Sequence, residues 1–145
     1  MEIFAAAFAA LYAAHHIGDY WIQSDTDAQH KGSAGKLGAL HCLRHVLTYI
    51  ATQVWCLALV LVATGDLYAG VPQLLLALVL SGVFHYAADR REHGLMFKLA
   101  RALPGKSDFL HFGQGERTLA TGAWALDQSW HIATSVFLPA LVLAL

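Results

Sequence analysis

The chain has 145 residues, of which 57% are hydrophobic and 13% charged, and its mean hydropathy is +0.50. Soluble domains carry about 25% charged residues and about 45–50% apolar ones, so the composition argues against a water-soluble globule. Nine Lys and Arg against ten Asp and Glu give a formal charge of −1, which excludes the basic footprint of a nucleic-acid-binding protein. The composition indicates an integral membrane protein.

Four stretches reach the length of about 20 residues that a bilayer demands of a spanning helix. Pro139, near the end of the last stretch, can kink it. In chain order the stretches are Ile3 to Gln23, Leu37 to Thr64, Val71 to Asp89 and Trp124 to Leu145. The sequence therefore predicts an all-α protein, with residues 1–145 forming one domain, an integral membrane four-helix bundle with four spans.

The basic residues are distributed unevenly among the connections. The second loop, Gly65 to Gly70, and both chain ends carry none of them. All nine lie in or beside the first and third loops: Lys31, Lys36, Arg44, Arg90, Arg91, Lys98, Arg101, Lys106 and Arg117. Because cytoplasmic loops are enriched in Lys and Arg, these two loops are predicted to be cytoplasmic and both termini to face outward.

The two basic loops differ in character. The first, Ser24 to Lys36, is polar and contains Gly and Ser, which indicates a flexible connection. In the third loop, apolar residues at helical spacing alternate with basic ones between Leu95 and Leu103, which predicts an amphipathic helix on the membrane surface. Pro104 and Gly105 end this helix. The following Phe109 to Phe112 segment is interpreted as an interfacial anchor in preference to a lid.

Each predicted span contains one pair of potential metal ligands spaced by four residues. The pairs are His15 and Asp19, His41 and His45, His85 and Asp89, and Asp127 and His131. Residues i and i+4 lie on one helix face, so each pair can point at one place. With both termini outside, the first and third spans run toward the cytoplasm, and their pairs lie near the end of the span. The second and fourth spans run away from the cytoplasm, and their pairs lie near the start. All eight side chains are therefore predicted to meet in the cytoplasmic half of the bundle.

Three other polar residues lie close to these pairs in the sequence. His16 competes with His15 as a ligand, because it lies three residues before Asp19 and residues three apart also share a helix face. His15 is preferred because it keeps the four-residue spacing of the other spans. Gln23 continues the face of His15 and Asp19 by another four residues, and Gln128 adjoins Asp127. His16, Gln23 and Gln128 are expected to support the metal ligands rather than to bind the metal.

A packing interpretation competes with the metal site. A single membrane-embedded His is more often a hydrogen-bonded packing residue than a ligand, and Asp–His hydrogen bonds could offset part of the cost of burial. An Asp at a helix centre costs about 2.5–3.5 kcal/mol on insertion scales, so such residues are rare without a partner. Metal ligation explains the residue types, the spacing and the shared depth together. The negative charges of three aspartates and a bridging hydroxide would balance the positive charges of two divalent ions. We therefore expect two divalent metal ions, which the His-rich ligand set suggests are Zn, Fe, Mn or Co.

The four ligand motifs together resemble a known family. The opening string is His15-His16-Ile17-Gly18-Asp19-Tyr20-Trp21-Ile22-Gln23, followed by His41-x-x-x-His45, His85-x-x-x-Asp89 and Asp127-Gln128-x-x-His131. This order resembles a bacterial and phage membrane family, the domain of unknown function 3307, over nearly the whole chain. The resemblance implies a fold, candidate ligands and a multi-pass location in the bacterial cytoplasmic (inner) membrane rather than a reaction. More distantly, the layout is similar to that of membrane-bound metal-dependent hydrolases.

Several functions stay open at this point. The preferred one is a hydrolase-like metal-dependent enzyme acting on a lipid or membrane-confined substrate, because a metal pair generates hydroxide and polarises an ester or phosphoryl group. The alternative is divalent-metal transport or storage, although the outer half of the bundle offers few polar residues. Haem binding by His41 and His131 would leave three aspartates unexplained, and a phage-exclusion or interaction role has no residue signature. Alanine stripes in the first span allow a homodimer.

Overall fold

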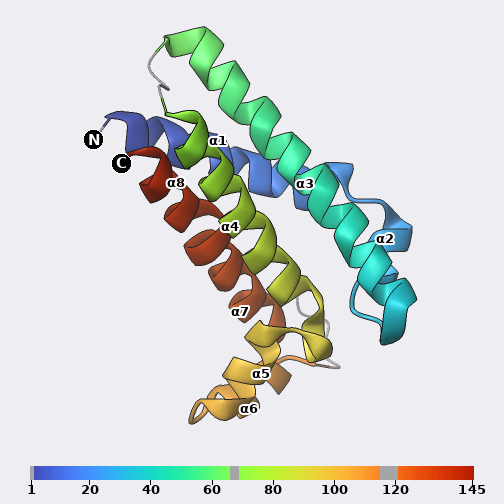
Figure 1. Cartoon of the computed structure of the whole chain (residues 1–145). Helices are drawn as coiled ribbons and strands as arrows, with labels where there is room; N and C mark the ends of the chain where they lie inside the picture. Colours follow the sequence, from blue (N-terminus) through green and yellow to red (C-terminus); the bar gives the residue numbers. More distant parts are fainter. Residues whose placement is uncertain (1, 66–68, 115–120) are drawn as a thin grey trace.

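The computed structural model describes residues 2–65, 69–114 and 121–145, and within these ranges the chain consists of helices and short connections, without any strand (Figure 1). Four long helical segments dominate. They are α1 (Glu2–Ile17) with the π-helix η1 (Gly18–Ile22), α3 (Gly35–Thr64), α4 (Val71–Asp89), and α7 (Gly122–His131) with the π-helix η3 (Ile132–Phe137) and α8 (Leu138–Leu143). Shorter helices connect them: α2 (Asp25–His30), the 3₁₀ turn η2 (Arg91–His93), α5 (Leu95–Ala102) and α6 (Lys106–His111).

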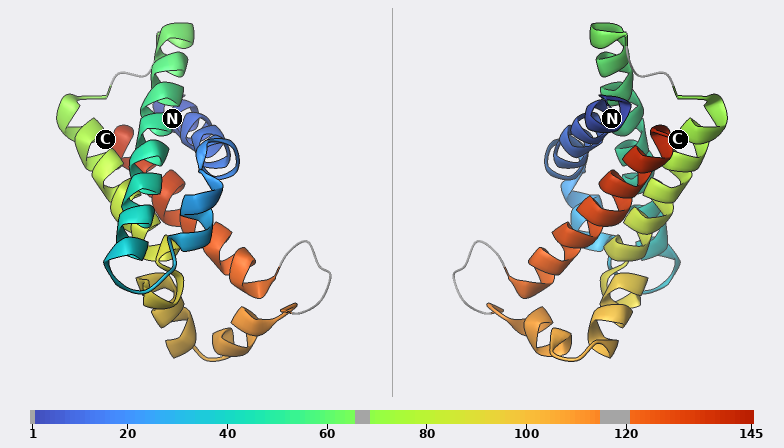
Figure 2. Two further views of the ribbon diagram at one scale, coloured as in Figure 1. Left: turned by 90° about the vertical axis from the view of Figure 1, so that its right-hand side faces the viewer. Right: turned by 90° about the vertical axis from the view of Figure 1, so that its left-hand side faces the viewer.

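The long segments pack side by side. α1 contacts α3 and α8, and α4 also contacts α3 and α8, so each segment has two main neighbours. Both termini lie at one end of this assembly, and α2, α5 and α6 lie toward the other (Figure 2). The short helices thus cover the end of the molecule at which the ligand pairs were predicted.

The end that carries the termini has an apolar core. Small residues of the first segment, Ala7, Ala10 and Ala14, are buried there and let the neighbouring helices approach closely. They pack with larger side chains such as Leu11 and Leu57. At least part of the alanine stripes noted in the first span therefore packs within the chain.

Pro139 affects the fourth segment through its missing N–H group. A helical Pro139 cannot donate to the carbonyl of Ser135, four residues earlier. The chain takes the wider π-helical form over Ile132–Phe137, and the Ser135 carbonyl instead accepts hydrogen bonds from Gln53 Nε2 at 3.0 Å and Ser81 Oγ at 2.9 Å. The disturbance expected at Pro139 is thus found as a π-helix. The Ser135 carbonyl in this π-helix links the fourth segment to α3 and α4.

For the two basic loops, the structure agrees with the prediction in the third loop and differs from it in the first. The amphipathic helix of the third loop is present as α5, with Met96 buried and Leu99 exposed. The expectation of a flexible first loop is wrong for residues 25–30, which form α2. Ser24 caps this helix by accepting a hydrogen bond from the Asp27 amide at 3.1 Å, which the Gly/Ser composition did not reveal.

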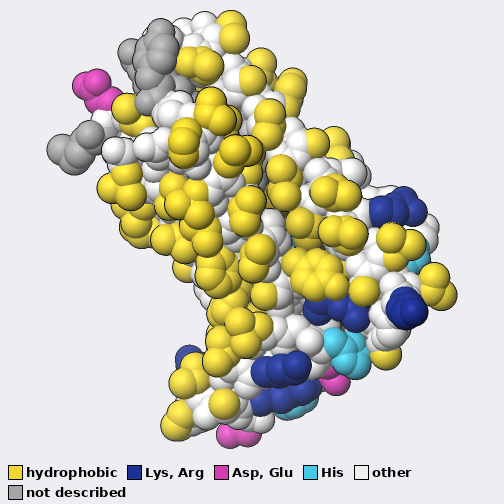
Figure 3. Space-filling model, in the orientation of Figure 1, with side chains coloured by type: hydrophobic (Ala, Val, Ile, Leu, Met, Phe, Trp, Pro, Cys, Tyr) yellow, Lys and Arg dark blue, Asp and Glu magenta, His cyan; other side chains and the backbone are white. Residues whose placement is uncertain are grey.

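Within the described residues, two helices are long and apolar enough to cross a membrane, α3 and α4. Apolar side chains cover most of the visible surface, whereas Lys and Arg gather toward the end where α2 and α5 lie (Figure 3). The other two long segments contain π-helices. For these two segments, and hence for the four-span bundle, crossing of a membrane stays a prediction.

Candidate metal centre

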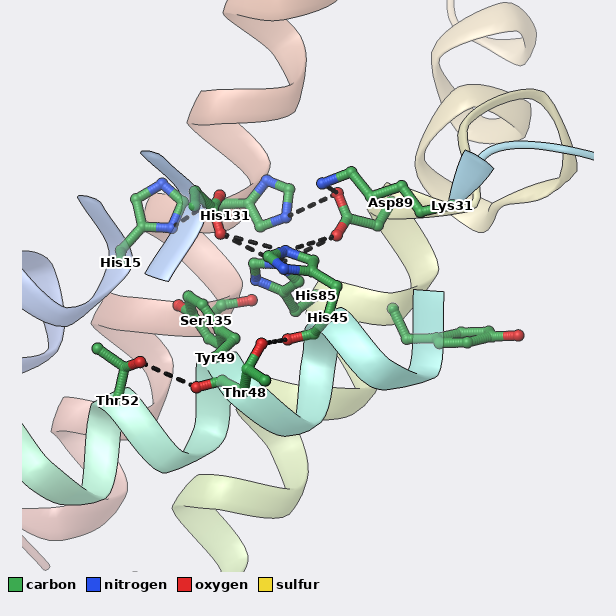
Figure 4. Close-up of polar contacts among 12 residues, drawn as sticks. His15, Lys31, His45, Thr48, Tyr49, Thr52, His85, Asp89, His131 and Ser135 are labelled. Carbon is green, nitrogen blue, oxygen red and sulfur yellow. Dashed lines mark hydrogen bonds and ion pairs between the residues drawn. The ribbon is translucent and has the colours of Figure 1, made fainter. Parts of the chain in front are cut away.

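Side chains from three of the long segments converge on one point (Figure 4). His45 Nε2 of α3 and His85 Nε2 of α4 lie 2.9 Å apart, and each is 3.1 Å from Asp89 Oδ2. Asp19 Oδ1, supplied by η1, lies 3.3 Å from His45 Nε2 and 3.5 Å from His85 Nε2. Two ligands bound at about 2.0–2.1 Å to one tetrahedral ion are roughly 3.3 Å apart. His45, His85 and Asp89 therefore supply three atoms spaced as the ligands of a single ion, and Asp19 faces the two histidines of this group.

The opposite oxygens of the same two carboxylates face other histidines. Asp19 Oδ2 lies 3.5 Å from His15 Nδ1, and Asp89 Oδ1 lies 3.9 Å from His131 Nε2. Asp127 joins Asp89 and His131 in a second group of potential ligand atoms, all within 4.8 Å of one another. Asp19 and Asp89 thus stand between two sets of histidines, which is the arrangement of carboxylates that bridge two metal ions.

The cluster contains several buried polar atoms without a hydrogen-bond partner. The four histidines of the cluster are at most 1% exposed. Five of the six unpartnered buried side-chain atoms among the described residues belong to it: His15 Nδ1, Asp19 Oδ1, His85 Nδ1, Asp89 Oδ2 and His131 Nε2. Buried polar groups in proteins are almost always paired. Four of these atoms face other ligand atoms of the cluster, so a cation among them would supply the missing partner.

Two hydrogen bonds orient histidine lone pairs into the cluster. His131 Nδ1 lies 2.7 Å from the Asp127 carbonyl oxygen, and His15 Nε2 lies 3.2 Å from Gln128 Oε1. Both oxygens are acceptors, so each of these nitrogens carries the proton and donates. The lone pairs of His131 Nε2 and His15 Nδ1 are thereby left facing Asp89 and Asp19. A hydrogen bond that fixes the tautomer in this way is typical of metal-bound histidines.

Seven of the eight predicted ligands meet in this cluster: His15, Asp19, His45, His85, Asp89, Asp127 and His131. The structure does not bring His41 to it. His41 Nδ1 lies 2.7 Å from Asp27 Oδ1 of α2. His41 is one helical turn, about 6 Å, before His45, and α2 meets α3 at that level.

Comparison with protein families gives a match over almost the entire chain. A family model described as "Protein of unknown function (DUF3307)" matches residues 7–144. The chain belongs to the DUF3307 family. No match was found among curated proteins or among solved structures. The distant likeness to membrane-bound hydrolases is not shown by these comparisons and remains an analogy. All seven cluster residues of this DUF3307 protein lie within the matched range.

The three predicted supporting residues have different surroundings in this DUF3307 chain. Gln128 contacts His15, as above, and its Nε2 lies 3.4 Å from Asp127 Oδ2. Gln23, with its amide oriented to suit its neighbours, donates to the Asp19 carbonyl at 3.3 Å and accepts from Lys31 Nζ at 3.0 Å. His16 lies outside the cluster, where its ring packs against Tyr12 and Tyr20.

Sequence reasoning missed Tyr49, whose fully buried ring lies 3.9 Å from that of His85. Tyr49 follows His45 by four residues, so the spacing that identified the ligand pairs extends to it. Gly18 makes room for this ring, because a Cβ atom at position 18 would lie 2.9 Å from Tyr49 Cδ2. The glycine of the His-His-Ile-Gly-Asp string therefore has a packing role beside the cluster.

Lys31 was also missed as a neighbour of the cluster. Its Nζ lies 2.7 Å from Asp89 Oδ1, and the side chain is almost fully buried. Arg90 holds the Lys31 backbone in place by donating to its carbonyl at 2.7 Å and to that of Ser33 at 2.9 Å. Lys31 lies in a non-periodic connection, so no sequence signal could have placed it here.

Asp27 is the centre of a separate polar group outside the long segments. Burial raises the pKa of Asp27, but hydrogen bonds from His41 and Ser24 and the charge of Arg44 together outweigh this effect. The pKa of Asp27 consequently lies below its usual value. This group fastens α2 to α3 beside the cluster.

Proposed function

We propose that this DUF3307 protein is an integral membrane metalloprotein, and that it is a hydrolase-like metal-dependent enzyme acting on a lipid or membrane-confined substrate. The observation that carries the metal is the grouping of His45, His85 and Asp89, whose ligand atoms lie 2.9 to 3.1 Å apart, with Asp19 Oδ1 at 3.3 and 3.5 Å from the two histidines. The bridging positions of Asp19 and Asp89 support two ions rather than one. The His-rich donor set suits Zn, Fe, Mn or Co better than Ca or Mg.

Four spanning segments are supported by continuity and length. The first segment runs without a break from Glu2 to Ile22 and the fourth from Gly122 to Leu143. At 1.5 Å per residue, each is about 30 Å long, which matches the hydrocarbon thickness of a bilayer. With the basic end in the cytoplasm, the cluster would lie in the inner half of a bacterial cytoplasmic membrane and both termini outside.

Hydrolysis is supported by the exposure of one edge of the cluster. The Asp127 side chain is 25% exposed, whereas that of Asp89 is 3% exposed. When bound, two divalent ions would supply hydroxide near neutral pH and polarise a phosphoryl or ester group. Asp127 would hold an ion at the side from which a substrate can approach, and Gln128 would fix the carboxylate of Asp127 and the ring of His15.

Transport or storage of metal is the second candidate, favoured by buried polar residues beyond the cluster. Gln53, Ser81 and Ser135 lie next to Tyr49 inside the bundle. Two of their hydrogen bonds end on the Ser135 carbonyl, and the apolar core of Leu11 and Leu57 follows toward the termini. A hydrated ion would have to pass this core, so the enzyme is preferred. Haem ligation by His41 and His131 is disfavoured, because His41 does not belong to the cluster that contains His131.

Cobalt substitution and flux measurements on the same purified protein separate the two functions. An enzyme keeps an open coordination position, so phosphate should change the visible spectrum of the cobalt-loaded protein, and proteoliposomes should show no metal flux. A transporter should show flux that Asp89→Ala abolishes. Flux without any spectral response to phosphate would reverse the preference.

A further inference from the structure

A polar cavity of about 370 Å³ opens onto the exposed edge of the cluster. It lies between α4, α7 and the segment of α5 and η2, and its walls include Asp89, Asp127, Lys31, Arg91 and Trp124. Two of the predicted metal ligands and two basic side chains thus face the same space. This cavity is the route by which a molecule from outside can reach Asp89 and Asp127.

The two basic residues are held there by specific contacts. The Lys31 ammonium pairs with Asp89 and donates to Gln23. The Lys31 backbone is held by Arg90, which donates to the carbonyls of Lys31 and Ser33. Arg91 has a φ of +47°, the one positive value among the described non-glycine residues, and its Nη2 donates to the Ala28 carbonyl at 3.2 Å. A non-glycine residue adopts this conformation only where its surroundings impose it, and such residues cluster at functional sites.

The charges around the cavity select an anion. If two divalent ions occupy the cluster, as the proposed function holds, they outweigh its three carboxylates. An ion at Asp89 would also repel the Lys31 ammonium and weaken its pairing with that carboxylate. Lys31 and Arg91 add two further positive charges, whereas Glu92 is paired with Arg101 at 3.2 Å. A phosphate monoester, with a charge of about −1.5 to −2 at pH 7, complements this balance better than a carboxylate does.

A neighbouring cavity of about 400 Å³ is almost entirely apolar. It is lined by the same two helices, α5 and α7, through side chains that include Met96, Leu99, Leu126 and Trp130. Met96 lines the apolar cavity and the adjacent Phe97 lines the polar one. Residues of α5 and α7 therefore line both cavities, one with basic side chains in its wall and the other almost entirely apolar.

We propose, resting on the metal centre of the proposed function, that the substrate is a lipid phosphate monoester. Its phosphate group binds in the polar cavity against Lys31 and Arg91, beside Asp89 and Asp127, and its hydrocarbon chain lies in the α5–α7 cavity. In hydrolysis, the oxygen of water bonds to phosphorus and the bond from phosphorus to the lipid oxygen breaks. One proton of the water passes to the leaving oxygen, so the products are a lipid alcohol and inorganic phosphate.

Titration of the zinc-loaded protein in a neutral detergent tests the phosphate site, with zinc measured in every sample. Inorganic phosphate should bind, and Lys31→Gln should weaken its binding about 10-fold or more, whereas Lys36→Gln, at the exposed start of α3, should leave it unchanged. Lys31→Arg, which keeps the charge, should restore most of the binding and shows that loss in Lys31→Gln is not misfolding. Equal phosphate affinity in Lys31→Gln and the unaltered protein at equal zinc content would overturn the proposal.

Dioctanoyl phosphatidic acid provides the lipid arm of the same experiment. It should bind about 10-fold more tightly than inorganic phosphate, and Leu99→Ser should remove this advantage without changing the affinity for inorganic phosphate. Equal affinities for the two probes would overturn the lipid assignment and leave free phosphate as the ligand. Zinc without phosphate binding would reject this inference alone, whereas absence of zinc would reject the metal centre and this inference together.

Discussion

His45 Nε2 and His85 Nε2 lie 2.9 Å apart, although the two residues are 40 positions apart in the chain and belong to different helices. Both nitrogens face the same oxygen of Asp89, at 3.1 Å. Two neutral imidazoles can share one proton between these nitrogens, but this leaves the Asp89 and Asp19 oxygens inadequately paired in a buried site. A cation bound by His45, His85 and Asp89 would give these three groups a common partner.

His85→Ala should release metal and lower the thermal stability. Among the described residues, His85 belongs to two groups of potential ligand atoms, one with His45 and Asp89 and one with His15 and Asp19, so its loss weakens both. A ligand that binds only the folded state stabilises it by about 2.7 kcal/mol at 100 times its Kd, and chelation should therefore lower the Tm of the unaltered protein by several degrees. Chelation should have little effect on His85→Ala. The exposed His93 of η2 is the matched control, and a Tm that falls equally in His93→Ala would argue against a specific site.

The Asp27 group predicts a pH dependence of stability. Because the pKa of Asp27 is lowered in the folded protein, its stabilising contribution is complete above the unfolded-state value, about 3.9, and is lost as the pH falls through the lower folded-state value. Asp27→Asn should lower the Tm at pH 7 by a few degrees, because it removes the charged acceptor of His41 and Arg44. The difference in Tm between the two proteins should shrink as the pH falls below about 4. A difference that stays constant down to pH 2 would contradict this account.

Gly18→Ala should destabilise the protein through Tyr49. The added methyl group would lie 2.9 Å from Tyr49 Cδ2, closer than carbon atoms approach, so the ring or η1 must shift. Overpacking of this kind costs about 1–3 kcal/mol. The penalty should be measured by chemical or thermal unfolding, and it should largely disappear when Tyr49→Ala is introduced as well. An equal penalty in the presence and absence of the tyrosine ring would show that the contact with Tyr49 is not responsible, since Ala itself favours the helix more than Gly does.

The proposed orientation predicts which positions are accessible from each side. Single cysteines in a background lacking Cys42 and Cys56, both of which are free and buried, serve as probes. Lys36→Cys and Lys106→Cys should react with an impermeant maleimide only after the membrane is opened. Glu2→Cys should react in intact spheroplasts. Labelling of Glu2→Cys from the cytoplasmic side alone would reverse the orientation.

Much of the cluster could be predicted because it depends on one local rule. Residues i and i+4 share a helix face, and in three pairs both members reach the cluster: His15 and Asp19, His85 and Asp89, and Asp127 and His131. The long helical segments were predictable from apolar runs of about 20 residues, the length expected of a spanning helix. The third span has the bounds predicted, Val71 to Asp89.

The rest depends on contacts between distant residues. Spacing indicates that His41 shares a helix face with His45, but it does not indicate how far the cluster extends along that helix. His41 in fact pairs with Asp27 of α2, outside the cluster. The place of Lys31 depends on Arg90, 59 residues later, which donates to its carbonyl. The π-helix before Pro139 follows from the lost hydrogen bond, but its role depends on donors from α3 and α4. Such contacts leave no periodic trace in the sequence.

Elemental analysis of the purified, detergent-solubilised protein is the most direct test of the metal centre. The arrangement of Asp19 and Asp89 between two sets of histidines predicts two divalent transition-metal ions per chain. His85→Ala should retain fewer than the unaltered protein, and His41→Ala should retain both. Less than one ion per two chains in protein purified without chelator and then exposed to Zn, Fe, Mn and Co in turn would contradict the account.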